Sequence, residues 1–249
     1  MTGFWAIYKR EMLSLWVTPV AWILLVTFLL LQGGVFYSIV SHYSGAAELS
    51  FDNGPIEAYF GQGSIFLLVT LLLLCPALSM RLFSEERRSG TIESLLTAPV
   101  RALSIVLGKY LATLSTYILM WSPTLLYPFL LRDTGVVDGG VVFTSYLGLL
   151  LLGAAYLAVG TLMSALTQSQ LSALMLTVLL QFGMFVLGVG EYIFDPGLLH
   201  SICSHVSMMS HMEEFSKGII DLRRVVFDLS VVVLALFTTT EVVDSWRWS

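Results

Sequence analysis

The residues of this sequence that could take part in chemistry fall in a few short stretches. The densest is the run FSEERRSGTIESLLTAPV at 83–100, where five charged residues lie within nine positions. Neighbouring acids and bases of this kind support ion pairs or the docking of a partner. His and Met gather at 204–222, and side chains of these types suit copper. Two further acids, Glu191 and Asp228, lie beside long apolar segments.

Motifs of hydrolytic enzymes are missing from the sequence. ATP hydrolysis by a P-loop needs GxxxxGK followed by Ser or Thr, and Gly108-Lys109 lacks both the upstream Gly and the hydroxyl residue. HMEEF at 211–215 has no second His for an HExxH zinc site, and no GxSxG nucleophile motif occurs. We therefore expect no catalytic residue, no metal site and no cofactor site on this chain, and no enzymatic activity.

Each remaining candidate has a structural and a functional interpretation. Asp228 lies near the end of the last apolar segment, where Arg224 four residues earlier can pair with it, so a structural role is favoured over contact with a substrate. Glu191 is a surface anchor or a residue of an outer gate. The His/Met stripe is expected to pack against membrane or protein rather than bind metal.

The composition predicts an all-α polytopic membrane protein. Of the 249 residues, 57% are hydrophobic and 12% are charged, whereas a soluble domain has about 25% charged residues. A membrane span needs about 20 mostly apolar residues. We predict a single domain over 1–249 with six spans, at about 19–40, 63–83, 104–131, 141–166, 171–191 and 224–241.

The distribution of Lys and Arg predicts the orientation of these spans. With the N-terminus inside, the inner segments hold eight of these residues and the outer segments four. The positive-inside rule therefore favours both termini in the cytoplasm, and an even number of spans agrees with this. The basic patches that would indicate nucleic-acid binding are missing.

Two segments are predicted to lie at the membrane surface. Residues 2–16 place large apolar side chains on one helical sector with Lys9 and Arg10 mostly opposite, as in an amphipathic interfacial helix. Residues 204–222 carry apolar and Met side chains at helical spacing, which predicts one outer re-entrant or interfacial helix before the last span.

The loop 84–103 between the second and third spans is predicted to contain a short helix. Thr91 is a plausible N-cap, Glu93 a favourable acid in the first turn, and Pro99 a helix terminator. Gly90 permits a sharp turn before it. Such a helix either packs on its own bundle or docks into a groove of a soluble partner, and the sequence by itself leaves both alternatives open.

The same stretch resembles a known family. Acidic and basic residues, Gly-Thr, a hydrophobe, an acid, a Leu-Leu pair, a Pro and a later Gly-Lys form the inner-loop signature of type-2 ABC exporter permeases. Members of the GldF type, from gliding motility, and of the NosY type are the most similar that we identify. The matching residues here are Glu86, Gly90, Thr91, Ile92, Glu93, Leu95, Leu96, Pro99, Gly108 and Lys109.

The resemblance implies a permease subunit in a bacterial cytoplasmic (inner) membrane. The N-terminal helix and the inner-loop helix of such permeases are coupling elements that contact a dimer of ATPase subunits, which bind ATP and Mg. A second permease copy, or a related GldG-like subunit, would complete the transporter. Export of a substrate and force transmission to a periplasmic partner are both expected alternatives, and an intramembrane enzyme or a passive scaffold is disfavoured.

Overall fold

The computed structural model describes residues 2–45, 54–62, 64–92, 100–132 and 137–246 of the chain. Within these ranges the regular structure is helical and no strand occurs. Six helical segments are long and apolar enough to cross a membrane. The fold is therefore that of a polytopic all-α membrane protein, as the composition predicted.

The helices of the first half of the chain begin with α1 (Thr2–Val17), α2 (Pro19–Gly45) and α3 (Pro55–Glu57). A short π-helix η1 (Ala58–Gln62) leads into α4 (Ser64–Ser79), and α5 (Ser84–Ser89) follows after a turn. The next predicted span is divided into α7 (Ala102–Trp121), the 3₁₀ turn η2 (Ser122–Leu125) and α8 (Leu126–Leu131). Pro123 lies at the start of the 3₁₀ turn. Proline has no backbone N–H, so it cannot donate the hydrogen bond that an α-helix interior requires.

The second half contains the longest helix, α9 (Gly139–Leu166), followed by α10 (Gln170–Val189) and the 3₁₀ turn η3 (Gly190–Tyr192). The chain then forms α11 (Leu198–Val206), α12 (Met208–Ser216) and α13 (Leu222–Ser245). The predicted single helix over 204–222 was wrong. Two helices replace it, because the extended backbone of Ser207 breaks the segment and its hydroxyl accepts the N–H of Ser210 at the start of α12.

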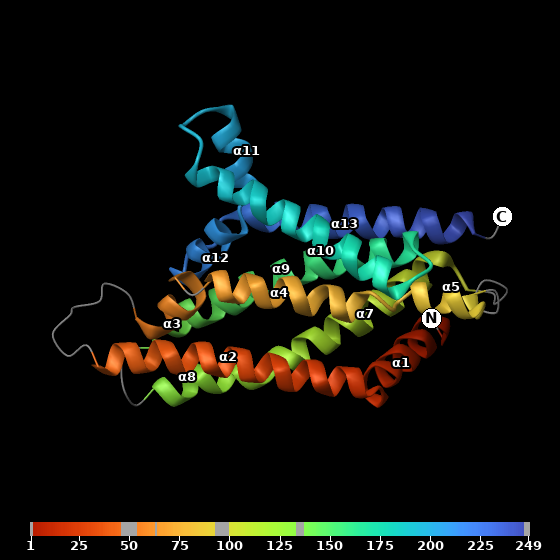
Figure 1. The fold of residues 1–249 in the computed structure, drawn as a ribbon, viewed down its shortest axis with the longest axis horizontal. Coiled ribbons are helices and arrows are strands. Elements are labelled where there is room, and N and C mark those ends of the chain that lie inside the picture. Colours follow the sequence, from red (N-terminus) through yellow and green to blue (C-terminus); the bar gives the residue numbers. More distant parts are fainter. Residues whose placement is uncertain (1, 46–53, 63, 93–99, 133–136, 247–249) are drawn as a thin grey trace.

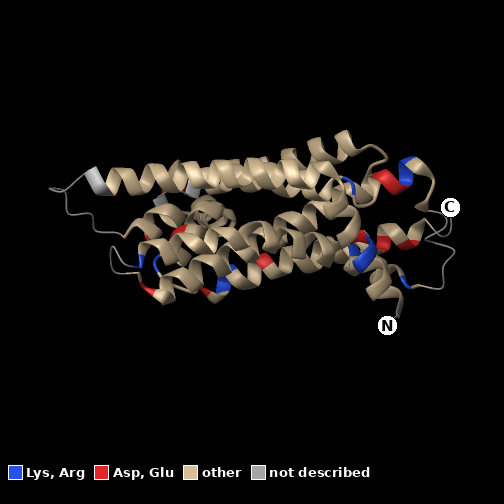
Figure 2. Ribbon diagram, turned by 90° about the horizontal axis from the view of Figure 1, so that it is seen from below, with Lys and Arg blue, Asp and Glu red and all other residues tan. Residues whose placement is uncertain are grey.

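The long helices form one elongated bundle with both chain termini at the same end (Figure 1). We call this end, with α1 and α5, the terminal end, and the end with α3, α8 and α12 the opposite end. Charged residues gather towards the two ends, and the middle of the bundle is largely free of them (Figure 2). A charge-poor middle suits the hydrocarbon layer of a bilayer.

Helix α9 is the centre of the packing, since it contacts α4, α7, α10, α12 and α13. Its small residues allow the neighbouring helices to approach closely. A Cβ atom on Gly148 would lie 2.6 Å from Cδ2 of Phe215 on α12, and one on Gly153 would lie 2.5 Å from Cε1 of Tyr117 on α7. The small face of α9 is thus used for packing within the chain.

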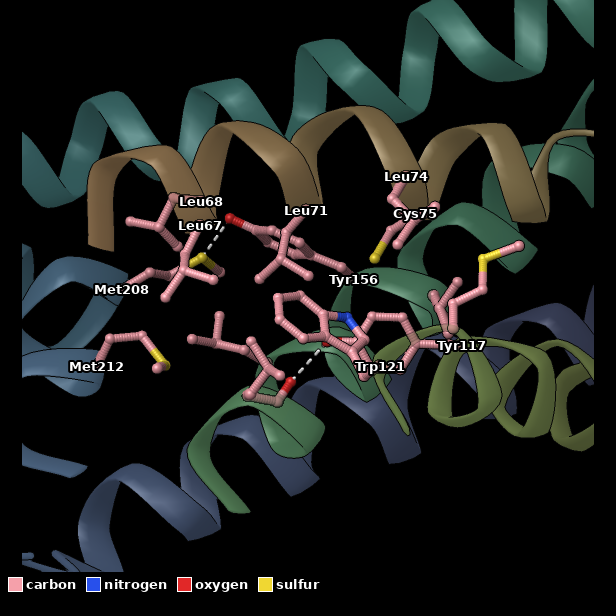
Figure 3. Close-up of a cluster of buried hydrophobic side chains, with 14 of the residues drawn as sticks. Leu67, Leu68, Leu71, Leu74, Cys75, Tyr117, Trp121, Tyr156, Met208 and Met212 are labelled. Carbon is pink, nitrogen blue, oxygen red and sulfur yellow. Dashed lines mark hydrogen bonds between the residues drawn. The ribbon is translucent and has the colours of Figure 1, made fainter. Parts of the chain in front are cut away.

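The core beside α9 combines Leu side chains of α4 with aromatic and Met side chains of its neighbours (Figure 3). Buried hydroxyl groups in this core donate across helices. Tyr117 donates to the Leu149 carbonyl at 2.9 Å, and Tyr156 donates to the sulfur of Met208. These bonds satisfy polar groups that neither lipid nor water reaches.

Replacing Gly148 by Ala tests the packing role of α9. The added methyl group would overlap the Phe215 ring, and such overpacking costs about 1–3 kcal/mol of unfolding free energy. We expect a lower melting temperature of the detergent-purified protein. Gly183→Ala on α10 is the matched control, because a Cβ there meets nothing within 4 Å. The control should melt at or above the wild-type temperature, and equal losses in both variants would contradict the packing role.

Candidate functional site

At the terminal end, α1 lies against α7 and crosses the end of the bundle obliquely (Figure 1). Ile7 and Leu15 of α1 are buried, whereas Trp5, Leu13 and Val17 stay exposed. The helices come together at Gly108, where an added Cβ would lie 3.0 Å from Cγ2 of Ile7. The Gly of the Gly-Lys pair therefore serves the docking of the N-terminal helix.

The charged side chains of three separate segments meet beside this contact. Nζ of Lys109 on α7 lies 2.9 Å from Glu11 Oε1 on α1 and 3.0 Å from Glu86 Oε1 on α5. Arg10 lies 2.6 Å from the same Glu86 oxygen and 2.9 Å from Glu11. We call Arg10, Glu11, Glu86 and Lys109 the charge cluster. Two positive and two negative groups balance within it.

The charge cluster is important for stability because most of its side chains are largely buried. The Lys109 side chain is 1% exposed, and Glu11 and Glu86 are 12% and 17% exposed. Lys109 also donates to the Leu82 carbonyl at 2.7 Å, and its ammonium lies 5.2 Å from the Phe83 ring centre. Removing one partner from a buried ion pair leaves an uncompensated charge and costs several kcal/mol. These contacts therefore constrain α1, α5 and α7 together.

The carboxyl group of Glu11 titrates differently inside the charge cluster. Burial raises the pKa of this carboxyl, but the charge and hydrogen bond of Lys109, together with those of Arg10, outweigh burial and hold that pKa below its ordinary value. Glu11 thus stays ionised in the folded protein at neutral pH, and its charge keeps the buried Lys109 paired.

Helix α5 is also held by contacts with the C-terminal ends of α9 and α13. The Ser164 hydroxyl of α9 accepts the backbone N–H groups of Phe83 at 3.0 Å and Ser84 at 3.2 Å, which caps α5 from another helix. Arg87 donates to the Ala165 carbonyl at 2.9 Å, near the C-terminus of α9, and its guanidinium carbon lies 4.7 Å from the Trp246 ring centre.

The residues that the resemblance assigned to docking have different surroundings in the structure. Glu86 faces the charge cluster instead of an open surface. Gly90 ends α5 with a φ of 71°, a left-handed conformation at the sharp turn expected there, and Thr91 is exposed. Ile92 is half-buried against the apolar cluster of Phe83 and Val106. The other four calls, Glu93, Leu95, Leu96 and Pro99, lie outside the described residues.

The two outer candidates, Glu191 and Asp228, lie at the opposite end of the bundle, and both face α12. Glu191 accepts a hydrogen bond from Ser210, and Asp228 lies next to His211. The expected pair of Asp228 with Arg224 was wrong. Arg224 Nη2 lies 3.1 Å from Glu214 Oε1 instead, because α12 brings that acid close to the start of α13.

Sequence reasoning missed two kinds of feature at the terminal end. The charged run that was assigned to a loop forms a helix, α5, since its acids come first and its basic residues last, as the helix dipole favours. Glu11 was not recognised as a partner of Lys109, and Arg10 was not recognised as a partner of Glu86. The signal for Glu11 was its spacing, since it follows Ile7 by four residues and precedes Leu15 by four, on the buried face of α1.

Comparison with known proteins agrees with this architecture. Residues 43–211, more than half of the 249-residue chain, match the ABC-2 family transporter proteins. The chain belongs to the ABC-2 transporter family. No curated protein matched it.

Membership of the ABC-2 family makes this chain a multi-pass membrane subunit of an ABC permease, and it implies an ABC ATPase as partner. The narrower likeness to the GldF and NosY permeases is a separate matter, which the family match leaves open. Among the described residues, no group of three or more His, Cys, Asp or Glu side chains lies together as a metal site would.

Lys109→Met tests the energetic role of the charge cluster. Glu11 and Glu86 would lose their shared buried partner, so we expect a loss of about 3–5 kcal/mol of unfolding free energy. Adding Glu86→Gln to Lys109→Met should recover part of this loss, because Arg10 would then face one acid instead of two. Arg88→Gln is the control, because Arg88 is an exposed residue of α5, the helix of Glu86, and this change should leave the stability unaltered. Equal stability of Lys109→Met and wild type would contradict the assignment.

Acidification tests the ionised state of Glu11. Because the pKa of Glu11 is lower in the folded state than its ordinary value of 4.5, its ionisation stabilises the fold above that pH. This contribution is lost as the pH falls through the folded pKa. We expect the melting temperature of the wild type to fall more steeply below pH 4.5 than that of Glu11→Gln. Parallel melting profiles would show that Glu11 does not contribute.

Proposed function

We propose that this ABC-2 subunit couples ATP hydrolysis on a separate ATPase to export of a substrate across a bacterial cytoplasmic membrane. The terminal end faces the cytoplasm, where the positive-inside rule places its Lys and Arg residues. ATP and Mg are bound by the partner, which works as a dimer. A second permease copy, or a related GldG-like subunit, completes the assembly.

The observation that carries this proposal is the charge cluster. It joins α1, the loop helix α5 and the spanning helix α7 through buried ion pairs. A force applied to the loop 84–103 therefore reaches α7 and α1 directly, because moving α5 alone would break ion pairs of a buried ammonium. The contacts of this segment with Ser164 and Ala165 of α9 and with Trp246 at the end of α13 would carry the same motion to two more helices.

The docking element of the proposal is the stretch from Ile92 to Leu96. Its apolar residues and the acid Glu93 would enter a groove of the ATPase, as the resemblance to type-2 permeases implies. Glu86 has a different role in this proposal. It transmits motion as a positioning residue inside the charge cluster, since its carboxylate contacts Lys109 and Arg10.

Force transmission without solute export is the second candidate function. In that case ATP-driven motion at the terminal end would move the outer helices α11 and α12 against a periplasmic partner, as in the gliding-motility type. The packing of α12 on α9 favours it, since Thr144 of α9 donates to the Phe215 carbonyl at 2.8 Å and Met212 is fully buried. Motion of α9 would therefore carry α12.

The docking prediction is tested with Leu95→Asp and Leu96→Asp combined. Carboxylates would oppose entry of this stretch into an apolar groove, so we expect co-purification of the ABC ATPase from membranes to fall at least about tenfold, which corresponds to a loss of 1.4 kcal/mol. The probe is the ABC ATPase that co-purifies with the wild-type chain. Arg88→Gln, an exposed change in the same loop, should retain it at the wild-type level.

The two functions are separated by reconstitution in vesicles. With ATP and the ATPase on the outer side of the vesicles, transport predicts accumulation of a tracer in the lumen that requires ATP and both subunits. Force transmission predicts ATP turnover without movement of solute. ATPase bound at the wild-type level by the double Asp variant would contradict the docking role of 92–96, whichever function holds.

A further inference from the structure

A second group of buried ionisable side chains lies at the opposite end of the bundle, away from the charge cluster. His211 of α12 and Asp228 of α13 have side-chain exposures of 0% and 2%, and His211 Nδ1 lies 3.8 Å from Asp228 Oδ1. His211 Nδ1 and both oxygens of Asp228 have no hydrogen-bond partner among the described protein atoms. Buried polar atoms are nearly always paired, so this arrangement needs an explanation.

The contact of the second ring nitrogen of His211, Nε2, shows which of the two nitrogens carries the hydrogen. Nε2 is 3.2 Å from the carbonyl oxygen of His205, and a carbonyl oxygen only accepts hydrogen bonds. Nε2 therefore carries a hydrogen. In the neutral ring Nδ1 is then a bare acceptor, and it faces the oxygen of an ionised Asp228, which is also an acceptor. Two acceptors and an unpaired buried charge are an unfavourable combination.

We propose that His211 and Asp228 form a binding site for a single proton. With one proton added, either Nδ1–H of an imidazolium donates to the carboxylate, or a neutral Asp228 hydroxyl donates to Nδ1. Both forms hold the same number of protons, so the proton belongs to the pair and not to one residue. A small approach of the two side chains from 3.8 Å to about 2.7–2.9 Å makes a charge-assisted hydrogen bond.

The neighbouring ionisable groups are occupied elsewhere and do not replace this proton. On α12 and α13, Arg224 pairs with Glu214 and donates to the Ser204 carbonyl, Glu213 pairs with Lys217, and Arg223 is exposed.

Tyr156 of α9 donates to Met208, and Tyr59 of η1 donates to Gln32 (Figure 3 shows the Tyr156 contact). Glu191 accepts from Ser210. Nδ1–H of His205 donates to the Ser201 carbonyl, and Cys203 of α11 is a buried thiol. Between 64 and 79, α4 carries no Asp, Glu, His, Lys or Arg.

The proton site gives the attachment of α12 to α13 a dependence on pH. With the proton bound, the pair joins the two helices through a hydrogen bond next to the Arg224–Glu214 ion pair. Without the proton, a buried carboxylate faces a bare nitrogen, and separation of the helices with entry of water becomes favourable. The attachment is therefore stronger with the proton bound than without it, and a rise in pH that removes the proton weakens it.

Asp228→Asn tests this site, because the Asn amide donates to Nδ1 at any pH. From about pH 6 to about pH 9 we expect the melting temperature of the full-length wild type to fall, and that of Asp228→Asn to stay nearly constant. Glu214→Gln is the control. It removes the neighbouring ion pair and should lower the melting temperature while keeping the wild-type pH dependence. A parallel decline of Asp228→Asn and wild type would overturn the proposal.

Nuclear magnetic resonance of ¹⁵N-labelled His gives an independent result, including the case in which Asp228→Asn fails to fold. The His211 signal is assigned by its loss in His211→Gln, with His205→Gln as the exposed control. At about pH 6 we expect the Nδ1 signal of a protonated or hydrogen-bonded nitrogen. A bare, unbonded Nδ1 at that pH would overturn the proposal. Loss of the pH dependence in Arg224→Gln, and not in Asp228→Asn, would also overturn it by making Arg224 the partner of Asp228.

Discussion

The organisation of the terminal end depends on one constraint, the burial of the Lys109 ammonium. A cation that is 1% exposed is costly to bury unless other groups replace its water. Those groups are the carboxylates of Glu11 and Glu86 and the carbonyl of Leu82. Since the two acids come from α1 and α5, the cation is stabilised only when both segments are in place. The N-terminal helix and the charged loop helix are in this way parts of one unit with α7.

Helix α9 extends this unit along the bundle. Its glycines admit Tyr117 and Phe215, so that α7 and α12 pack closely against it. Near its C-terminus, Ser164 caps α5, and near its N-terminus, Thr144 bonds to the backbone of α12. One continuous helix therefore contacts the charged segment at the terminal end and α12 at the opposite end. Close packing without flexible spacers transmits a displacement instead of absorbing it.

The sequence predicted the parts of the fold that depend on local composition. The six apolar segments coincide with the long helices, because a run of about 20 apolar residues can satisfy its backbone in lipid only as a helix. Gly90 marked a sharp turn, and the structure gives it a positive φ, which few other residues adopt. Local rules were less reliable where helices are short. The break at Ser207 and the helix formed by Ser84–Ser89 were both missed. The first depends on the extended backbone and the hydroxyl of one serine, and the second is capped by Ser164 of another helix.

What the sequence by itself determined is thus the class of protein, the spans and the placement of charge at their ends. The tertiary structure alone decided which charges meet. Glu11 and Lys109 are 98 residues apart in the chain, and their contact depends on how α1 crosses α7. Arg224 lies within one helical turn of Asp228 yet pairs with Glu214, so proximity along a helix did not predict the partner. An ion pair forms where packing brings opposite charges within a few ångströms, and packing is a property of the whole bundle.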